Sequence, residues 1–483
     1  MNVLFSLRRA KQFYGSNQAS GGYTWSEFYH RVHRRAAYLR GLGIEKGDRL
    51  AVWMLNSHDY LELFFATAIA GIAIVPLNTR WNASDVDFAL VDSEARALAL
   101  DAHFAARVDE LKNAPRVLSQ AEYSDAPAIF DEPGEDDLLG LFYTSGTTGG
   151  PKGVMLTHRN LWSHTLQMMQ SSGITQGVWL HAAPMFHAAD FWSVYVHAAL
   201  GGANVYLPTF DPEEFLRRVQ TDRVTDTVIV PTMMLMILNH PSFDRYDLSS
   251  VRRIFYGASP MPAPLIELAM RKLPHVQFIQ AYGMTETSPL IVLLEHKDHR
   301  DKRLAAAGKP GMGVEVRVVD FEDRDVPVGE CGEVIARGWN VMKGYWKRPE
   351  ITKDALRGGW MHTGDLGRFD EDGYLYILDR KKDMIKPGGE NVYSPEVESM
   401  ILSHPAVLEA AVIGVPHEKW GEAIRAVVVC RPNHSIHEME LIAWCRERMT
   451  HFKCPTSVMV AEALPKGGTG KIQKNLLRDR YGA

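Results

Sequence analysis

Apolar and polar positions alternate in blocks that predict a succession of helices and strands over roughly the first 300 residues. The segment 24–42 carries apolar residues at helical spacing and ends in glycine, which predicts a helix. The segment 49–55 is a continuous apolar run typical of a buried strand, and the run 63–75 stops at Pro76, which indicates a buried helix followed by a strand. Because helices and strands alternate in this way, we predict an α/β fold with a mostly parallel sheet.

The pattern changes twice towards the C-terminus. Between residues 310 and 378, short strands are separated by glycines, which indicates a small β-rich subdomain. The remaining segment reads helix, strand, strand, helix, which is enough for a compact α+β module. The stretch LDRKKDMIKPGGEN, charged and then glycine-rich, lies between the two. We therefore predict a large N-terminal domain, residues 1–378, and a small C-terminal domain, residues 379–483.

Length and charge favour a large enzyme and exclude one class of partner. The 483 residues exceed the size of one undivided core, and a formal charge of -5 leaves no basic footprint for nucleic acid. The four cysteines Cys331, Cys430, Cys445 and Cys454 form no CxxC pair and are too few for a disulfide framework, so we expect a reducing cytoplasm. No apolar run reaches the roughly 20 residues that span a bilayer, so we expect no transmembrane segment.

The segment YTSGTTGGPKGV, residues 143–154, lies between an apolar strand and a helix predicted over residues 152–169. Its hydroxyl residues, glycines and proline are equally common in surface turns. A glycine-rich backbone can, however, offer several N–H groups to one anion, and Lys152 supplies the counter-charge. The Walker pattern GxxxxGK[ST] is absent, because Pro151 precedes the lysine and Gly153 follows it. A triphosphate-binding loop of another type is therefore predicted.

This segment resembles the phosphate-loop signature of the adenylate-forming superfamily, which includes the AMP-forming acyl-CoA synthetases. Further signatures of that family follow in the family's order: PMFH ends at His187, YGAS at Ser259, QAYGMTE at Glu286, HTGD at Asp365, LDRKKDMIK at Lys386 and PKGGTGK at Lys471. Each is weak alone, and together they are specific. The resemblance implies an enzyme that converts a carboxylic acid and ATP to acyl-AMP and pyrophosphate, and then forms the CoA thioester and AMP.

The resemblance also implies where the nucleotide and its metal bind. Glu286, by itself readable as a loop carboxylate, would bind Mg²⁺ together with Thr147. Tyr282, by itself a core residue, would stack on adenine, and Asp365 with Arg380 would bind the ribose. The ATP- and AMP-binding residues implied in this way are Thr144, Ser145, Gly146, Thr147, Thr148, Gly149, Lys152, Gly257, Ala258, Ser259, Ala281, Tyr282, Gly283, Thr285, Asp365 and Arg380.

Two loops of the C-terminal domain carry the two steps in similar enzymes. Lys471 would bring its charge to the carboxylate and α-phosphate, which makes it catalytic together with Glu286, Thr147 and His187, the last in a gating and positioning role. A CoA-binding loop would contain Lys386, Gly388, Gly389 and Glu390, with Gly389 leaving room for pantetheine. The resemblance places the hinge between the domains at Asp379. Many relatives read NVYPAE where this chain reads NVYSPE, with its proline at Pro395.

The acyl substrate is the most open part of the prediction. The resemblance gives the pocket residues as His187, Ala188, Ala189, Trp192, Ser193, Tyr256 and Gly257. Small residues beside bulky apolar ones predict a roomy apolar cavity. No arginine is among these pocket residues, which disfavours a dicarboxylic acid. Asp190 is a charged exception, at a pocket wall or facing an amine-bearing substrate. Fatty acids and hydroxycinnamic acids both remain candidates.

Two other functions stay open at this point. A stand-alone adenylating enzyme would load a carrier protein instead of CoA, and a silent protein of the same fold would only bind nucleotide. The presence of Lys471, Glu286 and Asp365 argues against the silent protein. We therefore expect ATP, Mg²⁺, CoA and a small carboxylic acid as ligands, in a cytoplasmic enzyme that forms a homodimer.

Overall fold

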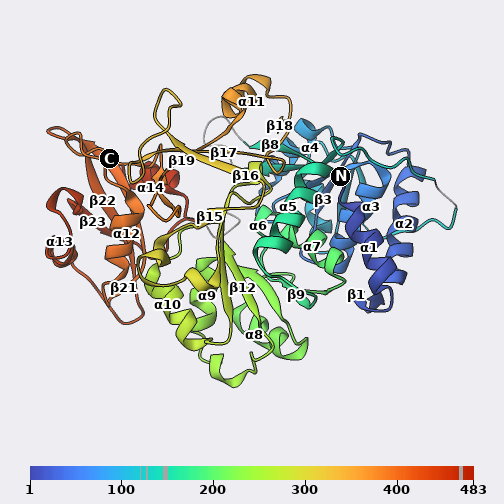
Figure 1. The fold of residues 1–483 in the computed structure, drawn as a ribbon, viewed down its shortest axis with the longest axis horizontal. Helices are drawn as coiled ribbons and strands as arrows, with labels where there is room; N and C mark the ends of the chain where they lie inside the picture. Colours follow the sequence, from blue (N-terminus) through green and yellow to red (C-terminus); the bar gives the residue numbers. More distant parts are fainter. Residues whose placement is uncertain (120, 127–128, 145–150, 467–471, 483) are drawn as a thin grey trace.

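The computed structural model describes residues 1–119, 121–126, 129–144, 151–466 and 472–482. Figure 1 shows the N-terminal part in blue and teal, the central part in green and the C-terminal part in red, each built around its own sheet. The yellow and orange strands of a further sheet lie above the green part in this view.

The first sheet has the strand order β18-β8-β7-β4-β3-β5-β6. Strands β6, β5, β3, β4 and β7 run parallel, and β8 and β18 extend the sheet antiparallel. Helices α1 to α3 contribute to the core on one face, and α4 packs on the other. The bounds are β3 (Arg49–Trp53), β4 (Ala73–Pro76), β5 (Ala97–Leu100), β6 (Arg116–Leu118), β7 (Leu138–Thr144), β8 (Lys152–Thr157), β18 (Gly344–Tyr345), α1 (Leu4–Tyr14), α2 (Trp25–Gly41), α3 (His58–Ala70) and α4 (Ala83–Ser93).

The second sheet has the order β15-β14-β13-β12-β11-β9-β10-β1-β2, and its strands from β13 to β1 run parallel. Helices α8 to α10 cover one face. Helices α5 and α7 contribute residues to the cores of both sheets, so they lie between them. The bounds are β1 (Gln18–Ser20), β2 (Tyr23–Thr24), β9 (Val178–His181), β10 (Ala203–Tyr206), β11 (Asp226–Ile229), β12 (Arg253–Gly257), β13 (Gln277–Tyr282), β14 (Val292–Leu294), β15 (Lys309–Pro310), α5 (His158–Ser171), α6 (Ala188–Phe191), α7 (Ser193–Leu200), α8 (Pro212–Thr221), α9 (Pro231–Leu238) and α10 (Ala263–Lys272).

Two smaller sheets complete the described chain. An antiparallel sheet of order β16-β17-β19-β20 follows the second sheet, and the C-terminal sheet has the order β21-β22-β23. Helices α12 and α13 pack on one face of the C-terminal sheet and α14 on the other. The bounds are β16 (Val314–Val319), β17 (Gly332–Gly338), β19 (Met361–Phe369), β20 (Leu375–Arg380), β21 (Val407–His417), β22 (Gly421–Cys430), β23 (Ser457–Val460), α11 (Pro349–Ala355), α12 (Ser394–Leu402), α13 (Glu438–Arg446) and α14 (Lys474–Tyr481).

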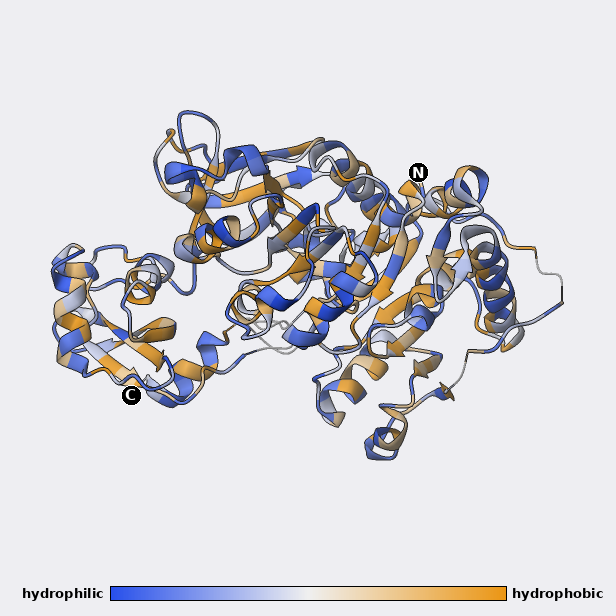
Figure 2. Ribbon diagram, turned by 90° about the horizontal axis from the view of Figure 1, so that it is seen from below, coloured by the Kyte–Doolittle hydropathy of each residue, from blue (hydrophilic) through white to orange (hydrophobic). Residues whose placement is uncertain are grey.

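The α/β class with mostly parallel sheets and a small α+β C-terminal module is confirmed. The helix predicted at 24–42 is α2, where Thr24 and Glu27 form a reciprocal capping box at its start. Figure 2 shows the pattern behind these predictions, with hydrophobic residues along the strands and hydrophilic ones on outer helix faces. Across the described ranges, no helix combines the length and apolarity that crossing a membrane requires.

One predicted helix is wrong in its first part. Residues Lys152–Thr157, expected to begin a helix at 152–169, form strand β8 instead, and α5 begins only at His158. Val154 and Leu156 are buried in the core on one face of the first sheet, and Met155 between them packs against the core on the other face, which is the alternation of a strand. Thr157 then caps α5 by accepting a hydrogen bond from the backbone N–H of Asn160, which fixes the helix start.

Candidate active site

The glycine-rich segment joins two antiparallel strands at one end of the first sheet. Thr144, the last residue of β7, lies opposite Lys152, the first residue of β8. Ser145, Gly146, Thr147, Thr148 and Gly149 lie outside the described residues. The ammonium of Lys152 lies 5.5 Å from the centre of the Tyr345 ring on β18, a cation–π contact. This lysine is therefore held beside the element that carries Tyr345.

Three predicted nucleotide residues meet around one carboxylate. The hydroxyl of Tyr282, at the end of β13, donates to Asp365 Oδ2 at 2.6 Å, and Arg380 Nε lies 3.2 Å from Asp365 Oδ1. Asp365 on β19 and Arg380 on β20 are direct cross-strand partners, which accounts for their proximity. Burial and the neighbouring carboxylate raise the pKa of Tyr282 well above its ordinary value, so its proton stays in this bond.

The turn before Asp365 opens onto a cleft. A cleft of about 310 Å³ is lined by Thr363, Gly364, Arg380, Lys381 and Lys382. Gly364 has a φ of 69°, a left-handed conformation that favours glycine, and Thr363 Oγ1 accepts from the N–H of Asp365 at 3.1 Å. The Asp365 carboxylate is thus fixed at the edge of a basic, polar cleft, as a ribose-binding group must be.

Glu286 is held by a residue that the sequence did not point to. It lies in a short 3-10 turn, Thr285–Thr287, is 6 % exposed, and accepts a hydrogen bond on Oε1 from the hydroxyl of Tyr345 at 2.8 Å. Its backbone oxygen accepts from Met342 N at 2.8 Å, which ties the turn to the segment before β18. Burial raises the pKa of the Glu286 carboxyl above its usual range, and the Tyr345 bond acts in the opposite direction.

The donor chemistry at Glu286 fits a hard cation. A charge-dense cation would stabilise the buried negative charge of this carboxylate, which lies near Lys152. Mg²⁺ is commonly held by one or two carboxylates together with phosphate oxygens and water. Thr147, the other predicted metal residue, lies outside the described ranges. Among the described residues no group of three or more His, Cys, Asp and Glu side chains could enclose a metal by itself. Glu286 therefore fits a metal that is shared with a phosphate ligand.

Two glycines of the predicted adenine region are required by close packing. A Cβ on Gly257 would stand 2.3 Å from the carbonyl oxygen of Ala281, and one on Gly283 would stand 1.9 Å from that of Pro289. Ala258 follows Gly257 with a φ of 64°, a strained conformation for a residue with a side chain. Neighbouring Ser259 and Thr285 lie at the ends of the same two strand segments. Strand ends of a parallel sheet, where ligands bind in such folds, thus carry this cluster.

The predicted acyl residues divide between two faces of β12. His187 caps α6, with Nδ1 accepting from the N–H of Ala189 at 3.1 Å. Trp192 packs edge-on against Phe255 with ring centres 5.4 Å apart, on the face towards α6 and α7. Tyr256 points to the opposite face and bonds His299 Nε2 at 2.8 Å. Tyr256 and Trp192 therefore lie on opposite faces of β12, because successive strand residues face opposite ways, and the place of Tyr256 in an acyl pocket stays a prediction.

Asp190 has a role within the protein. It is fully buried, its Oδ2 lies 2.5 Å from His181 Nδ1, and its Oδ1 accepts from the indole N–H of Trp179 at 3.3 Å. His181 Nε2 in turn lies 3.1 Å from Asn204 Oδ1. The carboxylate thus fastens α6 to β9 and is engaged by protein groups, so an amine-bearing substrate is not needed to explain it.

A polar cluster lies beside Trp192. The ring centre of His164 on α5 is 5.4 Å from that of Trp192. His164 Nδ1, Gln167 Oε1 and Ser193 Oγ are buried and have no hydrogen-bond partner within the described part of the chain. Burial lowers the pKa of His164 to about 3, so its imidazole is neutral. His164 thus gives the apolar surroundings of Trp192 a polar position.

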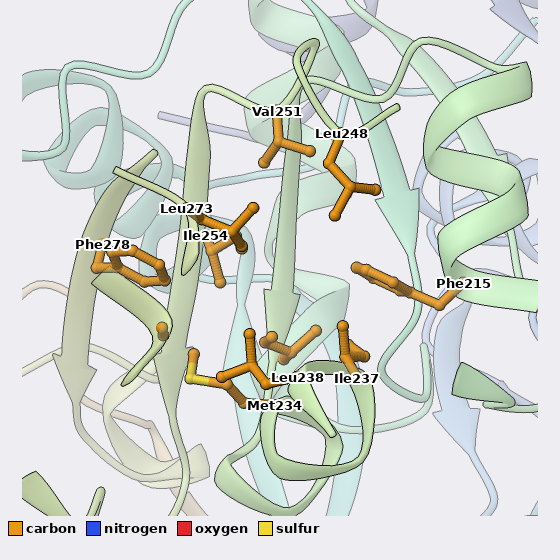
Figure 3. Close-up of a pocket in the computed structure, with 11 residues that line it drawn as sticks. Phe215, Met234, Ile237, Leu238, Leu248, Val251, Ile254, Leu273 and Phe278 are labelled. Carbon is orange, nitrogen blue, oxygen red and sulfur yellow. The ribbon is translucent and has the colours of Figure 1, made fainter. Parts of the chain in front are cut away.

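A closed cavity elsewhere is not this site. The cavity in Figure 3 has a volume of about 20 Å³ and lies among aliphatic and phenylalanine side chains between β12 and helices α8 to α10. Ile254, which lines it, faces the same side of β12 as Tyr256 and the side opposite Phe255. This space is about that of one water and has no polar wall, so it is a packing gap.

The predicted CoA loop leaves β20 and returns at α12. Gly388 and Gly389 both have positive φ, 63° and 92°, and a Cβ on Gly389 would meet no atom within 4 Å. Lys386 N donates to Glu422 Oε2 at 2.6 Å, which anchors the loop to β22, and Glu390 lies on its exposed side. Open space at Gly389 agrees with a passage for a chain-like ligand. Lys471 lies outside the described residues.

Comparisons with known proteins identify the chain. The family model described as "AMP-binding enzyme" matches residues 8–346, and that described as "AMP-binding enzyme C-terminal domain" matches residues 396–471. The chain belongs to the AMP-binding enzyme family. Several members of this family are similar to the chain in sequence or fold over nearly their whole length.

Among curated proteins, a feruloyl-CoA synthase of an Amycolatopsis species is 42% identical over 95% of this chain and 94% of its own length. The long-chain-fatty-acid–CoA ligase FadD13 of Mycobacterium tuberculosis is 37% identical over 95% and 93%. The structure of ATP-bound MatB from Rhodopseudomonas palustris matches with a TM-score of 0.90 and 33% identity over 100% and 99%. This AMP-binding enzyme is accordingly an AMP-forming acid–CoA ligase that uses ATP, Mg²⁺ and CoA.

Three residues of this AMP-binding enzyme that contact predicted site residues were not singled out from the sequence. Phe255 could have been found, because strand alternation places it on the same face as Gly257 and opposite Tyr256. His164 gave only a weak signal, as a polar residue among the apolar positions of a helix. Tyr345 gave none, since it follows Glu286 by 59 residues and reaches it only through the pairing of β18 with β8.

Proposed function

We propose that the acid activated by this ligase is an aromatic carboxylic acid of the hydroxycinnamate type. The observation that carries the proposal is the contact of His164, with its unpartnered Nδ1, against Trp192 in the aromatic group around α6. An aliphatic tunnel gains nothing from a buried polar nitrogen, which costs about 1–3 kcal/mol when unsatisfied. A ring hydroxyl or methoxy group would satisfy it, and the aromatic rings would pack on the acid's own ring. The similarity to a feruloyl-CoA synthase supports the same choice.

A fatty acid is the second candidate, favoured by the similarity to FadD13 and by the small, partly exposed Ala189 beside His187. The two acids differ in what they ask of the pocket. A fatty acid needs length without polar partners, whereas a hydroxycinnamic acid needs a short aromatic slot with a hydrogen-bond partner at its far end.

The site residues would divide the chemistry as follows. Asp365 would accept hydrogen bonds from the ribose hydroxyls, with Tyr282 and Arg380 keeping it in place. Bound at Glu286, Mg²⁺ would supply charge stabilisation for the phosphates. His187 would close the acyl pocket towards the nucleotide, and Lys152, Lys471 and the glycine-rich segment would carry the phosphate charge. Lys386 to Glu390 would line the path of the CoA thiol.

We further propose a division into an N-terminal domain, residues 1–378, and a mobile C-terminal domain, residues 379–483, with Asp379 as the hinge. The two steps make opposite demands on one site, since the first needs a cation over the α-phosphate and the second needs room for a thiol. A cytoplasmic location and a homodimer also stay predictions, which cell fractionation and light scattering test.

The experiment is a panel of carboxylic acids, from acetate through fatty acids to cinnamate, coumarate and ferulate, assayed for kcat/KM in pyrophosphate release. We expect a higher kcat/KM for the hydroxylated cinnamates than for cinnamate and for fatty acids of equal length. Ala189→Leu adds volume at a partly exposed position and should lower kcat/KM for ferulate about tenfold more than for acetate. A preference for long fatty acids would overturn the aromatic proposal.

A further inference from the structure

A buried polar cluster lies in the C-terminal module, apart from the nucleotide site. The carboxylate of Asp379 accepts two hydrogen bonds from Ser394, from the backbone N–H at 2.7 Å and from the hydroxyl at 2.8 Å. Lys474 Nζ donates to the same Ser394 hydroxyl oxygen and lies 2.7 Å from Glu398 Oε1. Glu398 Oε1 also accepts from Val412 N at 2.8 Å, so the cluster is tied to β21.

The cluster is largely shielded from solvent. Ser394 is fully buried, Asp379 is 5 % exposed, and the side chains of Lys474 and Glu398 are 15 % and 17 % exposed. Such a lysine–carboxylate pair has little competition from water, and its geometry is specified by the hydrogen bonds around it. Lys474 is the only cation in hydrogen-bond or ion-pair contact with Ser394 or Glu398 among the described residues.

The position of each member in the chain gives the cluster its significance. Asp379 is the proposed hinge, Ser394 lies four positions after Glu390 of the proposed CoA loop, and Lys474 is the first residue of α14, three positions after Lys471. Lys466 and Ile472, on either side of the undescribed residues 467–471, pair with each other as an antiparallel bridge. Lys474 therefore follows the base of one loop by two positions and contacts Ser394, which binds the hinge carboxylate just beyond the other loop.

Ser394 supplies both donors of the contact with Asp379. A proline at this position would have no N–H to donate. Here that N–H and the hydroxyl both bind Asp379 at the start of α12, so the carboxylate lies at the N-terminus of this helix. Ser394 thus links the hinge carboxylate to Lys474 in a way that a proline would not allow.

We propose that Lys474 is a positioning residue for both half-reactions: it holds the base of the adenylation loop and the base of the CoA loop in a fixed relation to the hinge. The inference rests on the proposed roles of the two loops. Lys474 itself touches no reacting atom, and its effect reaches the chemistry through Lys471 and through Lys386 to Glu390. We call the contacts of Lys474 with Ser394 and Glu398 the clamp. Loss of the clamp would misplace both loops, while acid and ATP would still bind to the N-terminal domain.

The test compares Lys474→Met with Lys453→Met in the full-length enzyme. Lys453 forms an ion pair with Glu396 at 2.7 Å on the same helix α12, at a more exposed place that does not contact Asp379 or Ser394. For each variant we would measure pyrophosphate release without CoA, and thioester formation from prepared acyl-AMP and CoA, using the acid that the wild type prefers. Thermal unfolding and active-site titration report any loss of folded enzyme.

We expect Lys474→Met to lower kcat of both half-reactions by between about tenfold and a hundredfold, with KM for ATP and acid unchanged within about twofold. Lys474→Arg should restore most of the rate, and Lys453→Met should leave both rates within about twofold. Should Lys474→Met fold poorly, Ser394→Ala keeps a backbone N–H for Asp379 but removes the link to Lys474, and should slow both half-reactions about threefold to tenfold.

Equal behaviour of Lys474→Met and Lys453→Met, a defect confined to one half-reaction, or unchanged rates in Ser394→Ala would each overturn the proposal. Failure of the wild type to use any aromatic acid would instead overturn the proposed substrate and leave the clamp to be measured with the preferred acid. The two failures are therefore distinct.

Discussion

The proposed nucleotide region and the proposed acyl region of this ligase satisfy their polar groups in opposite ways. Around Asp365 and Glu286, each carboxylate has a tyrosine hydroxyl bound to it, at 2.6 Å and 2.8 Å, before any ligand arrives. Around Trp192, aromatic rings pack tightly, and Nδ1 of the adjacent His164 has no hydrogen-bond partner among the described residues. The first region is preorganised for one chemistry, whereas the second leaves its polar positions for the substrate to use.

The largest expected effect concerns the carboxylate beside Tyr345. Glu286→Gln replaces a charged ligand with a neutral amide and should lower kcat for pyrophosphate release by about 10²–10³, the range for losing one preorganised electrostatic group. Titrating activity against Mg²⁺ should show a weaker metal dependence. Glu295→Gln, an exposed glutamate paired with Lys297, is the control and should keep nearly full activity. Normal turnover of Glu286→Gln would remove this residue from the metal site.

The next effect concerns the ribose. Asp365→Asn loses charge-assisted hydrogen bonds worth about 1.5–3 kcal/mol each, so KM for ATP should rise about tenfold to a hundredfold. KM for the acid should change little, because the acyl region has no contact with this carboxylate. Steady-state kinetics with each substrate varied in turn check this. Asp372→Asn, which breaks an exposed ion pair with Arg303, is the matched control. Equal changes in both KM values would mean that the two regions are not separate.

The smallest effect is on stability in acid and tests the acyl region alone. The pKa of His164 is lowered by burial from 6.5 to about 3, so its contribution to stability is fully present above about pH 6.5 and is lost as pH falls towards 3. Between pH 7 and 5 this one group should cost about 2 kcal/mol of unfolding free energy. In urea unfolding, His164→Leu should lose about 2 kcal/mol less unfolding free energy between pH 7 and pH 5 than the wild type loses. The control His434→Leu, at an exposed turn, should lose as much as the wild type. An unchanged pH dependence in His164→Leu would show that this imidazole is solvated.

The same contrast explains what the sequence could predict. Asp365, Arg380 and Glu286 lie in motifs whose order and chemistry point to a nucleotide site, and the structure brings the first two together as strand partners. Tyr256 was grouped with Trp192 although the two lie on opposite faces of β12, because an apolar run indicates the strand without telling which of its two faces the ligand meets. The contacts of Tyr345 with Glu286 and of His164 with Trp192 join residues far apart in the sequence. The local pattern of apolar and polar positions does not reveal such contacts.

The C-terminal module shows a similar limit. Its helix, strand, strand, helix order follows from periodicity and is found as α12, β21, β22 and α13. The cluster of Asp379, Ser394 and Lys474 spans 95 residues, and only the displaced proline beside Ser394 marked it in the sequence. Buried polar contacts of this kind arise from the fold, so the sequence indicates their members and not their partners.

A single-turnover experiment without CoA tests whether the reaction passes through acyl-AMP. Enzyme in excess over a radiolabelled aromatic acid is mixed with ATP and Mg²⁺, quenched over time, and analysed for acyl-AMP and pyrophosphate, with CoA added only after the first phase ends. We expect acyl-AMP to accumulate in step with pyrophosphate, and CoA then to convert it to thioester and AMP. Formation of ADP and phosphate, or thioester without prior acyl-AMP, would contradict this expectation.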